Sequence, residues 1–254
     1  MKKLGFAALV LAGLLCAACT PLYIATNQAV NSALTTSASW RYKMTVTVST
    51  PEGDRTGSAV REVHAYVYPP NSSLLGRTGR TILAKGEAVT VDLGERGVLF
   101  AMTSGDYGWR VVYDAFPFTG YTPAETAGET IQYYSSLKNA KATLTPKKYP
   151  NFVRFRDLNN PKTIENIRRP DMNLNEIKKS DPRRPIIDFE SAFGKGVNLK
   201  EVTIEMTDEP VTWGIEKYLP WVLTIGGGNL AGEPFSGKEW YQRLDKWEFK
   251  REQQ

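Results

Sequence analysis

Hydrophobic and polar residues alternate along the stretch that follows residue 40, and this period of two predicts a β-strand. Its apolar positions are Trp40, Tyr42, Met44, Val46 and Val48. Because successive side chains of a strand point to opposite faces, one face is expected to be buried and the other solvated. Pro51-Glu52-Gly53-Asp54 predicts a turn, and residues 58–68 predict a returning strand that stops at Pro69-Pro70. The pattern therefore predicts an antiparallel hairpin.

Short apolar stretches bounded by turn residues predict five further strands, at Ala88–Leu93, Val98–Met102, Trp109–Ala115, Phe152–Phe155 and Val197–Met206. The first two are separated by a tight turn at 94–97. Helical spacing and capping residues predict helices at Pro123–Ala140, at Phe189–Phe193 after an Asp188 cap, at Pro210–Leu219, and after a Ser236/Glu239 capping box. The expected fold class is α+β, mainly an antiparallel β-sheet with a few short helices, in a single domain.

The first residues have a different pattern, which is typical of a secretory signal peptide. Lys2 and Lys3 precede an uncharged apolar run from Leu4 to Leu15, and small residues follow it. A run of this length forms roughly 18 Å of helix, whereas a bilayer core needs about 20 residues to be crossed. We therefore interpret residues 1–18 as a leader that is removed.

Ala17-Ala18-Cys19 resembles the lipobox of bacterial lipoproteins, in which the cysteine sulfur receives a diacylglycerol and becomes the first mature residue. Cys16 departs from that pattern, because the family usually has Leu there. In the alternative reading, an ordinary signal peptidase cuts after Ala18 and leaves a periplasmic protein with one thiol. Lipid on Cys19 is favoured because the folded domain would then hold no cysteine, and a lone exposed thiol is a liability in an oxidising compartment.

The segment that follows Cys19 is uncharged and rich in Thr, Ser, Asn and Ala up to Ser39, which is typical of a spacer. The expected organisation is a signal peptide at 1–18, a lipidated flexible tether at 19–39 and one β-rich domain at 40–254. Resemblance to the sorting rule of enteric lipoproteins favours the outer membrane, facing the periplasm, because Thr20 and not Asp follows the cysteine.

Composition and charge narrow the function classes. With 41% hydrophobic residues in 254 the chain can bury a core, so a disordered protein is excluded. The net charge of +5 includes Lys2 and Lys3, and their removal leaves 30 basic against 27 acidic residues. No recognisable nucleic-acid module accompanies this small excess, so nucleic acid is not an expected partner.

The excess positive charge lies in one stretch, Lys147–Arg184, with 11 basic and 5 acidic residues. One reading is a patch for anionic lipid headgroups at Arg168, Arg169, Arg183 and Arg184. The other reading, which we favour, is a solvated loop, because no regular spacing places these charges on one face.

Catalytic chemistry finds little support in the sequence. His64 is the only histidine, so a multi-histidine metal site cannot be assembled, and neither cofactor nor metal is expected. Glu201 and Glu205 would stand about 13 Å apart along a strand, too far for paired carboxylates of a glycosidase. Asp208 and Glu209 are interpreted as caps of the helix after Pro210. The tryptophans are interpreted mainly as core residues, with stacking on sugars as the alternative.

Several segments together resemble an uncharacterised family of proteobacterial envelope proteins of unknown function. They are RYKMTVTVSTPEG from Arg41, GEAVTVDLGERGVLF from Gly86, AFGKGVNLKEVTIEMTDEPVTWGIEKYLPW from Ala192 and, less closely, YPNFVRFRDLNNPKT from Tyr149. These segments resemble strand, turn and cap signatures and contain no catalytic motif. The resemblance also places the basic residues between Ile167 and Ile186 in an apparent insertion.

Two functions from different classes follow. The first is a non-enzymatic envelope lipoprotein, attached to the membrane through its lipid, that binds or supports another envelope component such as a protein or anionic lipid. The alternative is an envelope hydrolase that acts on glycan or lipid through carboxylates. A pocket with converging carboxylates would favour the hydrolase.

Overall fold

Two β-sheets organise the part of the chain that the computed structural model describes, which comprises residues 36–68, 79–104, 108–119, 127–170, 186–236 and 239–252. The strand orders are β11-β3-β2-β1-β10-β6 and β4-β5-β7-β8-β9, and all neighbours are antiparallel except β8 and β9. The first sheet contains β1 (Thr36–Thr50), β2 (Gly53–Val67), β3 (Gly79–Glu87), β6 (Lys141–Thr143), β10 (Asn198–Met206) and β11 (Lys250–Glu252). The second contains β4 (Val89–Asp92), β5 (Val98–Ala101), β7 (Phe152–Phe155), β8 (Ile164–Ile167) and β9 (Ile186–Ile187).

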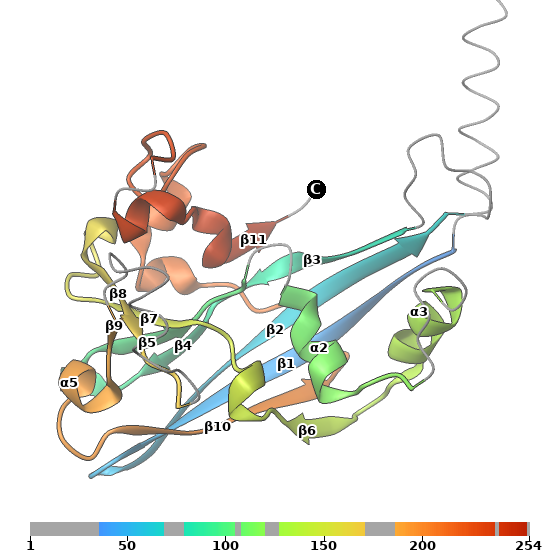
Figure 1. The fold of residues 1–254 in the computed structure, drawn as a ribbon, viewed down its shortest axis with the longest axis horizontal. Helices are drawn as coiled ribbons and strands as arrows, with labels where there is room; N and C mark the ends of the chain where they lie inside the picture. The colour runs from blue at the N-terminus through green and yellow to red at the C-terminus, as the bar shows by residue number, and fades with distance from the viewer. Residues whose placement is uncertain are drawn as a thin grey trace, which may run out of the picture.

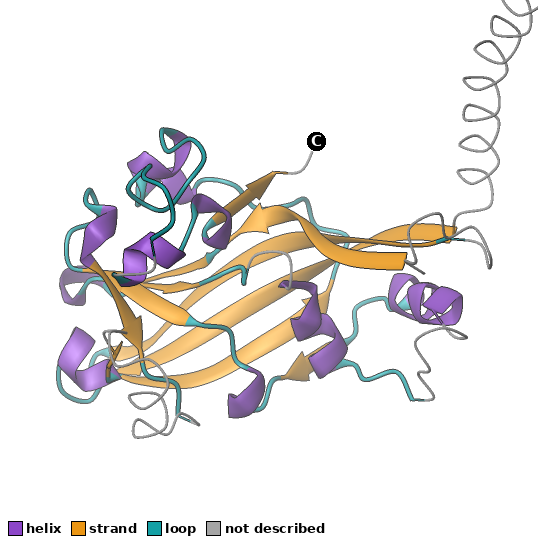
Figure 2. Cartoon of the chain, turned by 45° about the horizontal axis from the view of Figure 1, so that its top comes forward, coloured by secondary structure: helices purple, strands orange, loops and turns teal. Residues whose placement is uncertain are grey.

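Three short α-helices accompany the sheets within the described residues: α2 (Arg110–Ala115), α3 (Ala127–Ser136) and α5 (Phe189–Phe193). Figures 1 and 2 place α3 at one end of the large sheet, and α5 with the helical turns of the C-terminal segment at the other. The α+β class with mainly antiparallel strands is confirmed.

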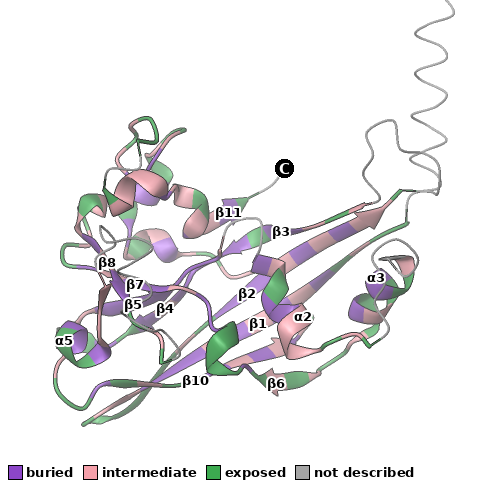
Figure 3. Ribbon diagram, viewed as in Figure 1, coloured by how far each residue is buried: buried purple, intermediate pink, exposed green. Residues whose placement is uncertain are grey.

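The predicted hairpin forms the centre of the large sheet. β1 and β2 pair along their whole length, from Thr36 opposite Val67 to Thr50 opposite Gly53. All five alternating apolar side chains of β1 are at most 6% exposed, so the buried face was assigned correctly. Figure 3 shows this alternation of buried and more exposed residues along both strands. The strand begins at Thr36, four residues before the predicted start of the domain.

The second sheet lies between two sets of apolar side chains. Val91 and Leu99 belong to the core shared with β1, β2 and β10, whereas Phe100 and Val153 pack with the C-terminal Phe249. All four residues of β5 are consequently buried, which explains why its sequence is a continuous apolar run.

A buried arginine connects the two sheets. Arg61 of β2 is 1% exposed, and its guanidinium donates to the carbonyl oxygens of Glu87 (2.8 Å) and of Ala101 in β5 (3.0 Å). A buried guanidinium is tolerated when its donors are satisfied. The two sheets are therefore held together by polar contacts as well as by apolar packing.

Two predicted elements are wrong. Residues 109–115 were expected to form a strand, but Arg110–Ala115 is helix α2. Val111 and Val112 are both buried, so consecutive side chains face the core, as a helix allows and a half-exposed strand does not. The helix predicted at Pro210–Leu219 is reduced to a 3-10 turn at Ile215–Lys217, because Gly214 before it has φ +127°, which is not a helical conformation.

The helix ends agree better with the sequence. Asp188 caps α5 as predicted, since its Oδ1 accepts the Ser191 N–H at 2.7 Å, and Gly194 ends that helix with φ +98°. The capping box predicted from Ser236 and Glu239 is displaced by three residues: Glu239 is the cap and Gln242 completes the box around a 3-10 turn. The helix predicted at 123–140 occurs as Ala127–Ser136, and its predicted start lies outside the described residues.

Candidate functional site

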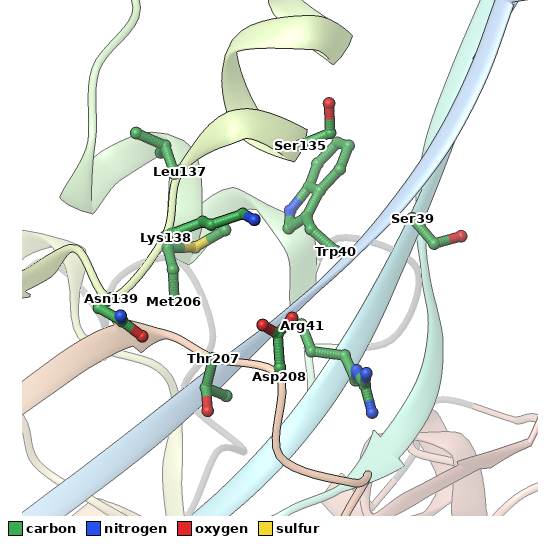
Figure 4. Close-up of a pocket in the computed structure, with 10 residues that line it drawn as sticks. All are labelled: Ser39, Trp40, Arg41, Ser135, Leu137, Lys138, Asn139, Met206, Thr207 and Asp208. Atoms are coloured by element: carbon green, nitrogen blue, oxygen red, sulfur yellow. The ribbon is translucent and has the colours of Figure 1, made fainter.

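A small cavity lies between the start of β1, the loop after α3 and the end of β10. Its volume is about 70 Å³. We call it the Trp40 cavity, and its lining is Ser39, Trp40, Arg41, Ser135, Leu137, Lys138, Asn139, Met206, Thr207 and Asp208 (Figure 4). These residues come from three segments far apart in the sequence, and the sheet brings them together because β1 pairs with β10.

The Trp40 ring is buried and stacked, but its indole nitrogen Nε1 has no hydrogen-bond partner among the described residues. The side chain is 6% exposed and its ring stacks on Tyr134 of α3, with centroids 5.7 Å apart and planes inclined by 27°. Its Nε1–H is buried, and no described group accepts a hydrogen bond from it. An unpaired buried donor costs about 1–3 kcal/mol, so this arrangement is expensive unless something else supplies an acceptor.

Tyr134 packs against Trp40 and is itself held by two contacts. Its ring stacks on Tyr113 of α2, with the ring centroids 4.0 Å apart and the planes inclined by 7°. Its hydroxyl donates to the Phe116 carbonyl oxygen at 2.9 Å. Burial is the main cause that raises the pKa of Tyr134 well above its ordinary value, so this hydroxyl stays a donor. The indole is therefore fixed by a stack of aromatic rings.

Two opposite charges line the same cavity. Lys138 and Asp208 are exposed residues at its rim, and neither forms an ion pair with a described residue. Asn139 beside Lys138 has φ +54°, a left-handed conformation that turns the chain sharply after α3. In Figure 4 the Lys138 amino group and the Trp40 indole nitrogen point into the same space, and the Asp208 carboxylate points toward it from the segment that follows β10.

A second cavity of about 150 Å³ lies around Trp213, and we call it the Trp213 cavity. Trp213 is 42% exposed, which corrects the interpretation of the tryptophans as core for this residue, and Lys250 Nζ lies 5.2 Å from its ring centroid. Glu87 is the carboxylate of the lining. Its Oε2 accepts the Ile215 N–H at 3.0 Å, and burial raises its pKa. Glu87 thus acts as a cap for the turn at 215–217.

The third cavity, of about 600 Å³, is an open depression beside the β1–β2 turn that includes Glu52, Arg55, Glu95 and Arg96. Glu52 and Arg96 form a two-contact ion pair at 2.6 and 3.2 Å, and Arg96 also donates to the Phe193 carbonyl oxygen at 3.0 Å. Hydrogen bonding from Arg96 lowers the pKa of Glu52 to about 2. The Glu52 carboxylate therefore accepts hydrogen bonds from Arg96 in an ion pair that supports the fold.

The structure describes only some of the residues that the sequence predicts to be functional. Cys19, Arg183 and Arg184 lie outside the described residues. Arg168 is exposed close to Asp188, whose pKa it helps to lower, whereas Arg169 is half-buried and donates to the Tyr149 carbonyl oxygen at 2.8 Å. The structure therefore gives the first two arginines of the predicted patch different surroundings.

Much of the described basic stretch is engaged in ion pairs. Lys148 pairs with Asp114 at 2.6 Å, Arg154 and Arg156 share Glu165, and Lys162 pairs with Glu233 at 3.1 Å. These pairs reduce the positive charge that the described part of the stretch presents to a ligand, and that part is not simply a loop, because it includes strands β7 and β8.

The other candidates have structural surroundings. His64 lies opposite Ser39 in the β1–β2 pair, and Ser39 Oγ lies 3.0 Å from its Nδ1. Glu209 pairs with Lys43 at 2.8 Å and, like Asp208, caps no helix. Among the described residues no group of His, Cys, Asp and Glu is placed to hold a metal ion, and no helix is long and apolar enough to cross a membrane.

Comparison with known proteins gave no match: no family model, no curated protein and no solved structure is detectably similar to this chain. The candidate site therefore has to be judged on its own geometry. Trp40, Lys138 and Asp208 carry it, and the sequence had assigned them to the core, to helical spacing and to a helix cap. Their juxtaposition depends on long-range packing, for which no local sequence signal exists.

Proposed function

We propose that this protein is an exported bacterial lipoprotein, held to the membrane by lipid on Cys19, that binds or supports another component of the cell envelope without catalysing a reaction. The sequence Ala17-Ala18-Cys19 after a basic, apolar leader is the observation that carries the proposal. Three acyl chains, as such lipoproteins usually carry, hold a protein far more firmly than the marginal binding of one.

The position of the Trp40 cavity supports a role near the membrane. Thr36 lies 17 positions after Cys19, a distance along the chain that spans at most roughly 60 Å. β1 starts at Thr36 beside α3 and runs about 50 Å to the hairpin turn at the far end of the domain (Figure 1). The Trp40 cavity therefore lies at the end of the domain to which the tether is joined.

The carboxylates of the three cavities favour binding over hydrolysis. Glycoside hydrolysis needs two carboxylates about 5 to 10 Å apart with distinct acid and base roles. Glu87 is engaged as a turn cap, and Asp208 is the acidic residue lining the Trp40 cavity. The third cavity has two carboxylates, Glu52 and Glu95, of which Glu52 is engaged in the ion pair with Arg96. The envelope hydrolase remains the alternative, and release of product from isolated glycan or lipid by the purified protein would favour it.

The decisive experiment compares Cys19→Ser with Cys16→Ser in cells fed radioactive palmitate. Cys19→Ser is expected to abolish labelling and to release the protein from membranes, whereas Cys16→Ser keeps both, because Cys16 leaves with the leader. Mass spectrometry of the native amino-terminal peptide provides the second readout. A bare Cys19 thiol at the mature terminus would overturn lipid anchoring and leave cleavage after Ala18 by an ordinary signal peptidase.

The proposed compartment is the outer membrane, facing the periplasm, on the basis of Thr20 after the cysteine. Exchange of Thr20 for Asp is expected to move the protein to the inner membrane in an enteric host. Separation of the two membranes by density, followed by detection of the protein in each fraction, tests this placement.

A further inference from the structure

We propose that the Trp40 cavity binds the head of a small zwitterion, with an oxyanion accepting from Trp40 Nε1–H and Lys138 and an ammonium group beside Asp208. The inference does not depend on lipid at Cys19, because it rests on the folded domain alone. It assigns a ligand class to a site whose residues no sequence pattern had connected.

The indole nitrogen identifies the acceptor side of the ligand. Trp40 is 94% buried, as its exposed fraction of 6% shows, and its Nε1–H has no described acceptor although it lines a cavity. A tryptophan nitrogen is only a donor, so whatever completes it must bring an oxygen or another acceptor. Lys138, also a donor only, points into the same space (Figure 4). Two donors directed at one point favour an oxyanion over a neutral acceptor.

Asp208 identifies the other half of the ligand. It lines the same cavity and forms no ion pair with Lys138 or with another described residue. The neighbouring Glu209, by contrast, accepts two hydrogen bonds from Lys43 Nζ, at 2.8 and 2.9 Å. A single anion would leave Asp208 facing a like charge, whereas a zwitterion places its ammonium group there. A water molecule would satisfy the indole but would neutralise neither charge.

The dimensions limit what can enter. A volume of about 70 Å³ is several times the roughly 10–15 Å³ that one water molecule needs. This accommodates a carboxylate or phosphate group, and the rest of the ligand must extend past the rim formed by the exposed Ser39, Ser135 and Asn139. Glycine and phosphoethanolamine, a carboxylate and a phosphate zwitterion, are the simplest members of the class.

The test follows the Trp40 indole signal by NMR in the chain from Cys19 onward carrying Cys19→Ser, labelled with nitrogen-15. Glycine and phosphoethanolamine are the zwitterionic probes, and acetate, methyl phosphate and ethanolamine are the matched single-charge probes. We expect at least one zwitterion to shift the Trp40 resonance and to bind at least about tenfold more tightly than its single-charge counterparts. Which zwitterion binds distinguishes a carboxylate source from a phosphate source, such as a phospholipid headgroup.

Three variants assign the contacts. Trp40→Phe keeps a ring on Tyr134 but removes the N–H, and Lys138→Met and Asp208→Asn each remove one charge. Each is expected to weaken binding about tenfold or more, as loss of a hydrogen bond to a charged group does. Lys141→Met is the matched control, because Lys141 lies three residues on, is exposed, and pairs with Glu205 on β10.

Trp40→Phe also has a readout that does not involve ligand. Removal of an unpaired buried donor should offset part of the packing lost with the smaller ring, so the thermal midpoint of the free protein should fall little. The proposal is overturned if no probe moves the Trp40 resonance, if single-charge probes bind as tightly as zwitterions, or if the Lys138 and Asp208 variants bind like the parent. The last two variants alter exposed side chains, so they keep the test valid should Trp40→Phe fail to fold.

Discussion

Gly57 of β2 lies directly against Thr90 of β4, at the point where the two sheets touch. A Cβ built on Gly57 would stand 2.7 Å from the Thr90 carbonyl carbon and 3.2 Å from the Val91 Cα, and both neighbours are backbone atoms that cannot rotate away. The absence of a side chain at residue 57 thus sets the distance between the sheets.

Gly57→Ala is therefore expected to destabilise the protein by about 1–3 kcal/mol or more, because the added methyl group has to push two backbones apart. Urea unfolding followed by circular dichroism measures the change. Gly128→Ala in α3 is the matched control: a Cβ there meets nothing within 4 Å, and replacement of a helical glycine should stabilise by up to about 1 kcal/mol. A Gly57→Ala variant as stable as the control would contradict this account of the contact.

The long hairpin could be predicted because its signal is local. One face of β1 is buried and most of the other is partly exposed, so the alternation from Trp40 to Val48 is complete in the sequence. α2 could not be predicted in this way, since Val111 and Val112 are β-branched residues that favour a strand, and only packing against the sheet decides for a helix. β3 escaped prediction because its buried residues 82–84 are consecutive and do not alternate.

The candidate site was beyond the sequence for a different reason. Trp40, Lys138 and Asp208 are each ordinary in their local context, and Lys138 lies 98 positions after Trp40 in the chain. They form a candidate site because the Trp40 indole N–H has no acceptor among the described residues and because Lys138 and Asp208 line the same cavity without forming an ion pair. Both properties depend on how the folded chain packs. The lipid site proposed at Cys19 has the opposite character, because enzymes would recognise it from the local sequence of the leader.

Glu248 is expected to make the stability of the domain fall as pH rises. Burial, with the negative charge of Asp245 adding to it, raises the pKa of Glu248 from 4.5 to about 7, while Arg251 opposes the change. The protonated form is thus favoured in the folded state. Its contribution is fully present below pH 4.5, decreases as pH rises toward 7, and is lost above that, by at most about 3 kcal/mol.

Glu248→Gln should remove this dependence, since an amide does not titrate. The variant is expected to be more stable than the parent at pH 8 and to approach it at pH 5, with urea midpoints as the measurement. Glu95→Gln serves as control, because the Glu95 side chain is exposed and its neutralisation should leave the difference between pH 5 and pH 8 as in the parent. Parallel curves for parent and Glu248→Gln would show that the Glu248 carboxylate is solvated.

Asp188 contributes at the other end of the pH scale. Hydrogen bonds from Ser191, with a smaller effect of Arg168, lower the pKa of Asp188. The stability it provides is present above pH 3.8 and is lost as pH falls through the lowered pKa. Asp188→Ala should cost about 1 kcal/mol at neutral pH, and Asp188→Asn should retain most of the cap. Equal losses for both variants in thermal unfolding would argue against the capping hydrogen bond as the cause.

Lipid binding by the basic stretch Lys147–Arg184 is best tested at arginines that do not support the fold. Arg169 donates to the Tyr149 carbonyl oxygen, so its reversal would disturb the fold, whereas Arg168 is exposed and Arg183 and Arg184 remain sequence-based candidates. If the stretch binds anionic lipid, the triple change Arg168→Glu, Arg183→Glu and Arg184→Glu should weaken binding to phosphatidylglycerol vesicles. Each basic residue near such a surface contributes about 1 kcal/mol.

Binding by the parent should also decrease with salt, because screening shortens the range of the attraction to about 8 Å at physiological ionic strength. The control reverses Lys85, Lys141 and Lys200, three exposed lysines of the large sheet, and changes the net charge by the same amount. Loss in the arginine variant alone assigns the effect to a patch, whereas equal loss in both variants assigns it to net charge. Because Lys148, Arg154, Arg156 and Lys162 already have acidic partners in the fold, we expect little lipid binding by the stretch, with the arginine variant binding as the parent does.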